Sequence, residues 1–460
     1  MGRIAPAFVF FGVIACVPER PESSPTTACE PGAIEACYSG APATRDVGAC
    51  RAGTRACDAS GAWTSCLGEL LPVQERCADG VDNDCNGAVD DDVDADGDGW
   101  TSCGGDCCDN AGICSAPGLV NPGAFDVAGN GLDDDCNGVL DDTKLLCDQA
   151  IASNTTSALD FARAIDICDG VVDAKLSLAD GSGVPDPEGH AVRRQFGANV
   201  LPQGGVNLAI LSTGGAAAKN DVLPGFHPWI SYTHAGTNTS PFPADFLAAN
   251  GGKLPNAPGC PDPAGTTAND SEMLTLRLRV PTNARSFKLS VNFYSAEFPE
   301  WTCTSFNDFF VVLLDSTYQG DQPNPADKNL AFFAPASGLK VPVGVNLAYG
   351  NTGLFTQCVN GETGCSGMSG SISSCTGTSL LAGTGFDDAA PGACNANSLL
   401  GGATGWLVTS GNVTPGEVIT LRIAIWDTSD HAWDSLAVVD GFQWSTDLAQ
   451  PGTVIFKPRL

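Results

Sequence analysis

The residues in this chain best placed to do chemistry are aspartates that alternate with other residues in short, glycine-containing loops. One ten-residue pattern occurs twice, at 82–91 and 133–142, and seven of its ten positions are identical in the two copies. A third loop, with aspartates at 94, 96 and 98 and glycine at 99, lies between them. Acids at positions 1, 3 and 5 with glycine at 6 wrap oxygens around one point, and calcium takes about six to eight oxygens. We therefore predict that the chain binds two or more calcium ions.

The position of each residue in its loop predicts the ligands. They are Asp82, Asp84, Asn86, the Ala88 carbonyl and Asp90 in the first loop; Asp94, Asp96, Asp98 and the Trp100 carbonyl, with Asp106 and Asp109 downstream, in the middle loop; and Asp133, Asp135, Asn137, the Val139 carbonyl and Asp141 in the last loop. An EF-hand adds a bidentate glutamate at position 12, where this chain has Val93, Gly105 and Lys144. The loops are therefore not EF-hands. We expect Asp91, Asp92, Asp142, a neighbouring loop or water to complete each site.

The charge of the chain is concentrated around these loops. The chain has 22 Lys+Arg against 53 Asp+Glu, a formal charge of −31, which argues against a nucleic-acid or anionic-membrane partner. Between residues 79 and 148 there are 18 Asp, no Glu, no Arg and one lysine. A packed core does not hold so many unpaired carboxylates, so this segment either binds cations or forms acidic turns without metal. Disorder would favour Glu, Ser and Lys over Asp, Asn, Gly and Cys.

The cysteines and the N-terminus indicate export. The chain has 21 Cys and only 4 His, which favours disulfides in an oxidising compartment over structural zinc. Residues 1–15 have the shape of a signal peptide. Val13-Ile14-Ala15-Cys16 resembles a lipobox, which predicts lipidation of Cys16; an ordinary cleavage site is the alternative. We expect no contact with a membrane apart from this lipid anchor.

The elements that must position the Asp loops follow in order along the chain. Residues 16–28 are predicted to be a lipidated cysteine and tether, 29–76 a Cys-rich module held by disulfides, and 77–142 the Asp-rich repeats. Residues 143–170 are predicted to be a helical connector, with 154–156 as a break and with Cys147 and Cys168 able to tie its ends.

Residues 171–460 are predicted to form a β-sandwich or jelly roll. Hydrophobic residues alternate at 274–280 and 287–293, and 309–314 is a continuous apolar run typical of a strand buried on both faces. Segments 418–425 and 436–442 complete the set, without helices between them. The fold class is therefore mainly β, with little regular structure in the Asp-rich region and one short helical segment.

Two stretches carry resemblances to families. Residues 77–87, 94–100, 106–109 and 121–124 resemble the metal-binding repeat of the MopE type over about 77–142. One relative's name is linked to copper, but copper prefers His, Met or Cys thiolate. This segment has no His and no Met, which favours calcium.

Residues 211–214, 293–301, 305–310 and 425–435 resemble the choice-of-anchor L domain of bacterial surface proteins, over about 164–444. The resemblance implies an extracellular location and no established catalytic activity. Acidic and amide residues lie beside aromatic ones in these stretches. We consider a second metal or ligand site there, with turn capping as the alternative, formed by Glu297, Asn307, Asp308, Asp427, Asp430 and Asp434.

These observations predict a protein that is not an enzyme, because no G-x-S-x-G, H-E-x-x-H or phosphate-binding loop is present. We expect a secreted lipoprotein on the surface or outer membrane of a Gram-negative bacterium. Its calcium-stabilised loops would present a β-sandwich for adhesion to an extracellular polysaccharide or surface protein. The alternatives are a secreted carbohydrate-active enzyme or its carbohydrate-binding module, and a purely structural envelope protein.

Overall fold

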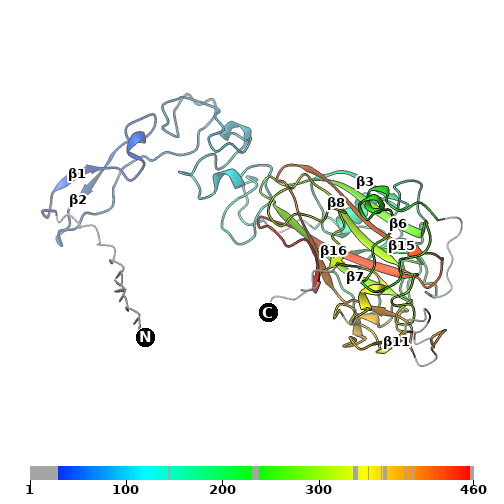
Figure 1. The fold of residues 1–460 in the computed structure, drawn as a ribbon. Coiled ribbons are helices and arrows are strands. Elements are labelled where there is room, and N and C mark those ends of the chain that lie inside the picture. Colours follow the sequence, from blue (N-terminus) through cyan, green and yellow to red (C-terminus); the bar gives the residue numbers. More distant parts are fainter. Residues whose placement is uncertain are drawn as a thin grey trace, which may run out of the picture. The chain divides into compact units, whose positions relative to one another are not determined.

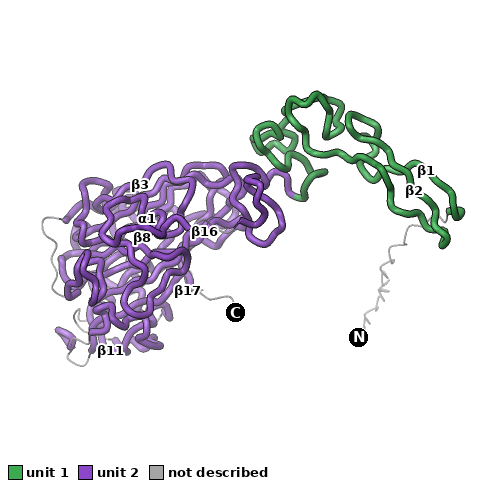
Figure 2. Tube along the Cα trace, turned by 180° about the vertical axis from the view of Figure 1, so that it is seen from behind, with its two compact units in different colours: residues 1–115 green, residues 116–460 purple. Residues whose placement is uncertain are grey.

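The computed structural model describes residues 29–142, 146–229, 238–334, 340–350, 352–363, 365, 370–388, 391–395 and 398–455. The predicted signal peptide, the tether and Cys16 lie outside these residues. The chain divides into two compact units, residues 1–115 and 116–460 (Figure 2). The boundary falls inside the predicted Asp-rich module, between its middle loop and its last loop. None of the helices in the described ranges combines the length and the hydropathy that crossing a membrane requires.

Disulfides hold the first unit together. Its regular elements are the antiparallel strands β1 (Ile34–Cys37) and β2 (Gly53–Ala56) and the 3-10 turns η1 (Pro42–Thr44) and η2 (Ser102–Gly104). Among residues 29–115 the buried apolar side chains are all cysteines: Cys50, Cys57, Cys85 and Cys108. The bridges are Cys29–Cys57, Cys37–Cys66, Cys50–Cys85, Cys77–Cys103 and Cys108–Cys114. A unit with so small an apolar core depends on such cross-links for its stability.

The second unit contains two large antiparallel sheets, as predicted (Figure 1), and two small two-stranded ones, β9 with β10 and β11 with β12. The larger has strand order β17-β14-β7-β16-β5-β4, with β13 also pairing with β7, and the smaller has order β3-β6-β15-β8. The strands are β3 (Val171–Ser177), β4 (His190–Arg193), β5 (Leu208–Ser212), β6 (Ala268–Arg279), β7 (Ser286–Ser295), β8 (Phe309–Asp315), β9 (Phe332–Phe333), β10 (Val341–Pro342), β11 (Gly361–Thr363), β12 (Gly370–Ile372), β13 (Gly402–Ala403), β14 (Leu407–Asn412), β15 (Val418–Thr428), β16 (Ser435–Ser445) and β17 (Gly452–Ile455). The helical elements are η3 (Pro117–Leu119), α1 (Ala158–Ala164), α2 (Ala244–Ala249), η4 (Val345–Ala348) and η5 (Ser379–Leu381).

The main core lies between the two sheets, and the alternation of each strand explains it. Leu274, Leu276 and Leu278 of β6 face this core together with Leu289 and Val291 of β7. The other face of the smaller sheet is also covered, because α2 and its neighbours pack on β8 and β15. The other face of the larger sheet packs beneath the segment around η5. Strand β8 is therefore buried on both faces, which explains its uninterrupted apolar sequence.

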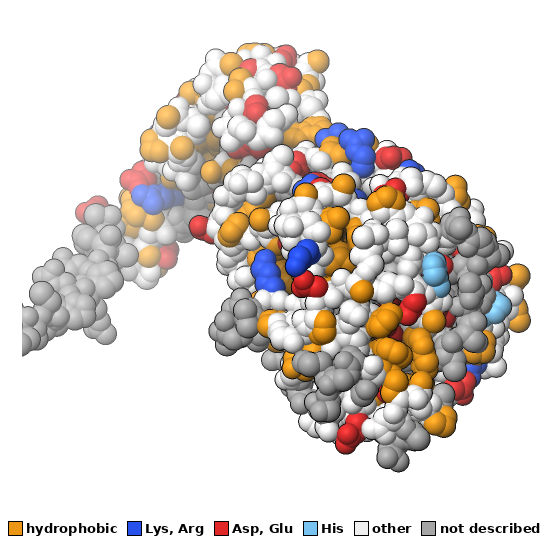
Figure 3. All heavy atoms as spheres, turned by 45° about the vertical axis from the view of Figure 1, so that its right-hand side comes forward, with side chains coloured by type: hydrophobic (Ala, Val, Ile, Leu, Met, Phe, Trp, Pro, Cys, Tyr) orange, Lys and Arg blue, Asp and Glu red, His pale blue; other side chains and the backbone are white. Residues whose placement is uncertain are grey.

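The strands predicted from the sequence are confirmed, but the connector is less helical than expected. Only α1 forms in the described part of the connector, and Phe161 of α1 is buried in the main core. The expected bridge between Cys147 and Cys168 is present. The face drawn in Figure 3 carries a few separate basic side chains among acidic, apolar and neutral ones.

Candidate metal sites

The middle Asp loop brings five carboxylates together. One oxygen each from Asp96, Asp98 and Asp106 lies within 4.8 Å of the others, and so does one each from Asp94, Asp96 and Asp109. Asp106 is fully buried, and its Oδ2 and Asp96 Oδ2 have no hydrogen-bond partner. Asp106 Oδ1 accepts the Cys108 N–H at 2.8 Å, beside the Cys108–Cys114 bridge. The two unpartnered oxygens therefore remain available to an ion.

Two of these carboxylates also accept hydrogen bonds from the backbone of the loop. Asp94 accepts the N–H groups of Gly97 and Gly99, at 2.6 and 3.0 Å. Asp109 closes the loop from the far side, by accepting the Ala95 N–H at 2.7 Å and the Ser102 hydroxyl at 3.0 Å. The five carboxylates predicted from the sequence thus form two groups of three that share Asp96. The Trp100 carbonyl stays a prediction.

The first and last loops share one internal hydrogen-bond pattern. Asp82 accepts the Gly87 N–H at 3.1 Å, and Asp133 accepts the Gly138 N–H at 2.9 Å. The amide groups of the two asparagines recur as well: Asn86 Nδ2 donates to Asp84 and Asp91, and Asn137 Nδ2 donates to Asp135 and Asp142. The left-handed backbone also recurs, at Cys85 and Asp90 and again at Cys136 and Asp141. The sequence repeat is therefore a structural repeat.

A glutamate that the sequence analysis missed completes the first loop. One oxygen each from Glu75, Asp84 and Asp91 lies within 4.8 Å of the others, and Glu75 also groups with Asp79 and Asp90. Glu75 is buried, its Oε2 accepts the Asn83 N–H at 3.0 Å, and its Oε1 has no hydrogen-bond partner. Glu75 therefore supplies an acidic group to this loop, as the glutamate at position 12 does in an EF-hand.

Asp126 is the counterpart of Glu75 in the last loop, 51 residues further on. It accepts the Asp134 N–H at 2.9 Å, just as Glu75 accepts the Asn83 N–H. Aligning the two repeats with the same offset of 51 residues, but starting before the first aspartate of each loop, would have paired Glu75 with Asp126.

Asp90 and Asp141 also accept backbone hydrogen bonds, and their roles as metal ligands stay predictions. Asp90 accepts the Asp79 and Gly80 N–H groups, and Asp141 accepts the Gly129 and Gly131 N–H groups. These carboxylates therefore fix the turn before each loop, although Asp90 also stands in the group with Glu75. The contributions of the Ala88 and Val139 carbonyls stay predictions.

The electrostatics of the loops favour a bound cation. Burial, together with the nearby Asp98, Asp109 and Asp96, raises the pKa of Asp106 to about 6. Burial also raises the pKa values of Asp84, Asp96 and Asp135, each of which has other carboxylates beside it. A raised carboxyl pKa marks negative charge that the protein leaves uncompensated. A cation at these positions would compensate it.

The residues of the predicted second site gather at one end of the sandwich. Glu297, Asp308, Asp427 and Asp434 are each at most 2% exposed. Asp430 is half-buried beside them and accepts the Ala432 N–H at 3.2 Å. Asn307 serves a neighbouring turn, because its Oδ1 accepts the Asn346 N–H at 3.0 Å.

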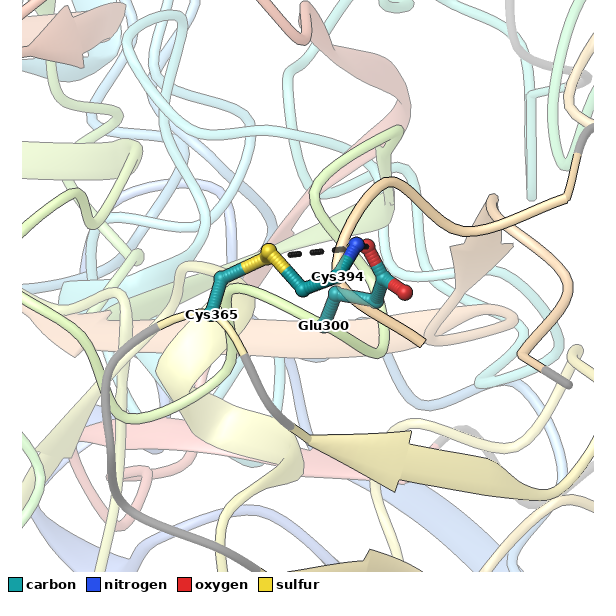
Figure 4. Close-up of side chains that lie close together, drawn as sticks. All are labelled: Glu300, Cys365 and Cys394. Atoms are coloured by element: carbon teal, nitrogen blue, oxygen red, sulfur yellow. Dashed lines mark hydrogen bonds between the residues drawn. A yellow bond between two sulfur atoms is a disulfide. The ribbon is translucent and has the colours of Figure 1, made fainter. Parts of the chain in front are cut away.

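One further group with metal-ligand residue types has another role. Glu300 lies beside Cys365 and Cys394 (Figure 4), but these cysteines form a disulfide and offer no thiolate. The Glu300 carboxylate accepts the N–H groups of residues 393, 394 and 395 at 2.7–3.0 Å. It therefore anchors a loop.

Comparison with known proteins supports the metal-binding interpretation of the Asp-rich region. Residues 73–91 and 118–142 match the family model Cu-binding_MopE, described as "Putative metal-binding motif". The matched ranges include both Glu75 and Asp126. The chain matches no curated protein and no solved structure.

The donor atoms of the loops do not fit copper, the metal in that family's name. Residues 73–142 contain no His and no Met, and each of the 20 cysteines from Cys29 to Cys394 is disulfide-bonded. Copper favours imidazole, thioether or thiolate ligands, whereas carboxylate and amide oxygens suit hard cations. The residues present thus fit a hard cation.

Proposed function

We propose that this chain is an extracellular surface protein whose Asp-rich loops bind calcium. The observation that carries the proposal is the middle loop, where Asp96, Asp98 and Asp106 converge and two buried carboxylate oxygens have no partner. Calcium accepts several carboxylates in an irregular shell, whereas magnesium demands near-octahedral geometry and keeps its waters. The disulfide-bonded cysteines support an oxidising, extracellular setting.

In this proposal calcium makes the first unit rigid. Its carboxylates repel one another, and among residues 29–115 its only buried apolar side chains are cysteines. An ion bound only by the folded loops therefore adds its binding free energy to stability. The loops then act as a calcium-dependent stalk.

The β-sandwich would act as the presented domain. The resemblance of about 164–444 to choice-of-anchor L domains supports display at the cell surface, with a lipid on Cys16 as the anchor and no catalytic role. An extracellular polysaccharide or a surface protein is the proposed ligand. Screening the full chain against bacterial polysaccharides in calcium tests this part, and absence of any binding would leave the sandwich a structural domain.

Dialysis of the full chain against equal calcium and copper, followed by metal analysis, tests the choice of metal. We expect calcium to be retained and copper to be lost. The double variant Asp96→Asn/Asp106→Asn should retain less calcium. Glu30→Gln, which removes one charge from an exposed residue of the first unit outside the Asp loops, should retain as much as the wild type. Stoichiometric copper without calcium would refute the proposal.

A further inference from the structure

The buried carboxylates of the sandwich arise from the same alternation that builds its core. On β7, residues 287, 289, 291 and 293 face the space between the sheets, and the buried Glu297 lies in the turn that follows the strand. On β8, residues 310, 312 and 314 face the space between the sheets, and Asp308 precedes Phe310 by two residues, in the same alternation. On β15, residues 419, 421, 423 and 425 face it, and Asp427 follows. At one end of the sandwich, the inward row therefore changes from leucine, valine, isoleucine and phenylalanine to carboxylates.

Strand register brings these side chains together from both sheets. The ladder between β15 and β8 ends at the pair of Trp426 and Phe309, and Asp427 and Asp308 are the next residue on each side of that pair. The two carboxyl groups therefore lie close enough to interact. The Asp308 carboxylate also reaches the other sheet, because Oδ2 accepts the Ser435 hydroxyl of β16 at 2.5 Å.

Asp434 joins the group from the end of β16. Its carbonyl accepts the Ala296 N–H at 3.0 Å, which places it beside Glu297. Gly214 leaves room for its carboxylate, since a Cβ on that glycine would lie 2.3 Å from Asp434 Oδ2. Four carboxylates from four chain segments thus surround one end of the space between the sheets.

These carboxylates have unmet bonding capacity. Asp434 Oδ2 and Glu297 Oε2 are buried without a hydrogen-bond partner. The Asp427 carboxylate is buried within reach of Thr213 and Asp308, yet neither of its oxygens makes a hydrogen bond of normal geometry. Among the described residues, no lysine or arginine forms an ion pair with any of the four. Burying one unpaired carboxylate is already costly, and four ionised together are not tolerable without a counterion.

We propose that Glu297, Asp308, Asp427 and Asp434 form a second cation site that binds a hard divalent ion, with calcium as its natural occupant. The ion would join the two sheets at this end of the sandwich. The site is separate from the Asp loops and does not depend on the function proposed for them. Within the described structure no three of these carboxylates approach one another to within 4.8 Å, unlike the Asp-loop groups. A bound ion would draw them together.

The competing explanation is that protons neutralise the group. Burial raises the pKa of Asp308 to about 8 and raises the pKa values of Glu297, Asp427 and Asp434 well above their usual range. Protonated carboxyls and a bound ion make opposite predictions for neutral isosteres. Asn at position 427 would mimic a protonated Asp427 but could not supply a charged ligand.

The test counts calcium ions per chain in the full-length protein, by metal analysis after equilibrium dialysis. We expect Asp427→Asn to bind one ion fewer than the wild type. The matched control Asp440→Asn also replaces a fully buried aspartate, in the middle of β16, and should bind as many ions as the wild type. A folded Asp427→Asn protein with an unchanged count would overturn the proposal in favour of protonation.

A second variant keeps the test decisive if Asp427→Asn does not fold. Asp84→Asn, Asp96→Asn and Asp135→Asn combined alter all three Asp loops and leave the sandwich intact. This chain should still bind one calcium ion, and that ion should persist whether or not the Asp loops prove to be calcium sites. If the triple variant binds no calcium, the proposed sandwich site is overturned. The number of calcium ions bound by the wild type still tests the proposal for the loops separately.

Discussion

Replacing Asp106 by asparagine should have opposite effects on stability with and without calcium. The buried carboxylate of Asp106 has its pKa raised from 3.8 to about 6 by burial and by Asp98, Asp109 and Asp96. A raised carboxyl pKa means that stability is fully present below about pH 4 and is lost as the pH rises through about 6. At pH 8 without metal, the loss is at most about 3 kcal/mol, since each pKa unit corresponds to about 1.4 kcal/mol.

Asparagine does not ionise, and its Oδ1 can still accept the Cys108 N–H. In EGTA at pH 8, Asp106→Asn should therefore be more stable than the wild type, by up to about 3 kcal/mol. In calcium the order should reverse. An ion at about 1,000 times its dissociation constant adds roughly 4.1 kcal/mol to a chain that binds it, which exceeds the variant's advantage of about 3 kcal/mol, and the variant lacks a charged ligand.

The assay is urea unfolding of the full chain at pH 8, with disulfides intact, in EGTA and in 10 mM calcium. Trp63 and Trp100 lie in the first unit and report on its unfolding. Glu30→Gln, at an exposed residue of the first unit outside the Asp loops, is the control and should follow the wild type in both buffers. The reasoning is refuted if Asp106→Asn is the less stable protein in EGTA, or if calcium stabilises it as much as it stabilises the wild type.

Three further predictions follow. Glu75→Gln should weaken calcium binding about tenfold or more, measured by calorimetric titration, because it removes the buried charge beside Asp84 and Asp91; an affinity equal to that of the exposed control Glu30→Gln would show that Glu75 only orders the turn. In EGTA, the free energy of unfolding of the wild type should fall between about pH 4 and pH 7, partly because burial raises the pKa of Asp440 to about 7. Asp440→Asn should make this decline shallower in urea melts at a series of pH values. An unchanged slope would contradict the raised pKa of Asp440. Replacing Cys50 and Cys85 together by serine should lower the calcium affinity of the first loop, because their bridge fixes position 4 of that loop; titration should show the loss, and an unaltered affinity would mean that the loop is preorganised without the bridge.

The sequence predicted the sandwich strands well because the alternation of apolar and polar residues that forms a strand can be seen within the strand itself. The leucines at 274, 276 and 278 alternate with polar residues, and the structure places all three in the main core. The connector was harder to predict, because apolar residues at helical spacing also occur in extended segments that pack on a core. Here Ile151 packs against the main core from outside any helix, and α1 begins only at Ala158.

The candidate sites show what a motif contains and what only the fold can supply. The five carboxylates of the middle loop lie within 16 residues of one another, so spacing alone was enough to group them. Glu75 was missed because it precedes the first aspartate and reaches the loop by a turn of the backbone. The approach of Asp308 to Asp427 depends on the register of β8 and β15, whose paired residues are 105 or more positions apart along the chain, and no local pattern encodes that register.

The most direct test of the central claim is thermal unfolding of the full chain in calcium and in excess EGTA, with metal analysis of the same samples. Calcium-binding loops predict bound calcium and a rise in the melting temperature of the first unit of roughly 10 °C or more, given an ion worth about 2.7 kcal/mol on a unit of this size. No bound calcium and the same melting temperature in both buffers would contradict the claim and leave the Asp-rich region an acidic, disulfide-bonded spacer.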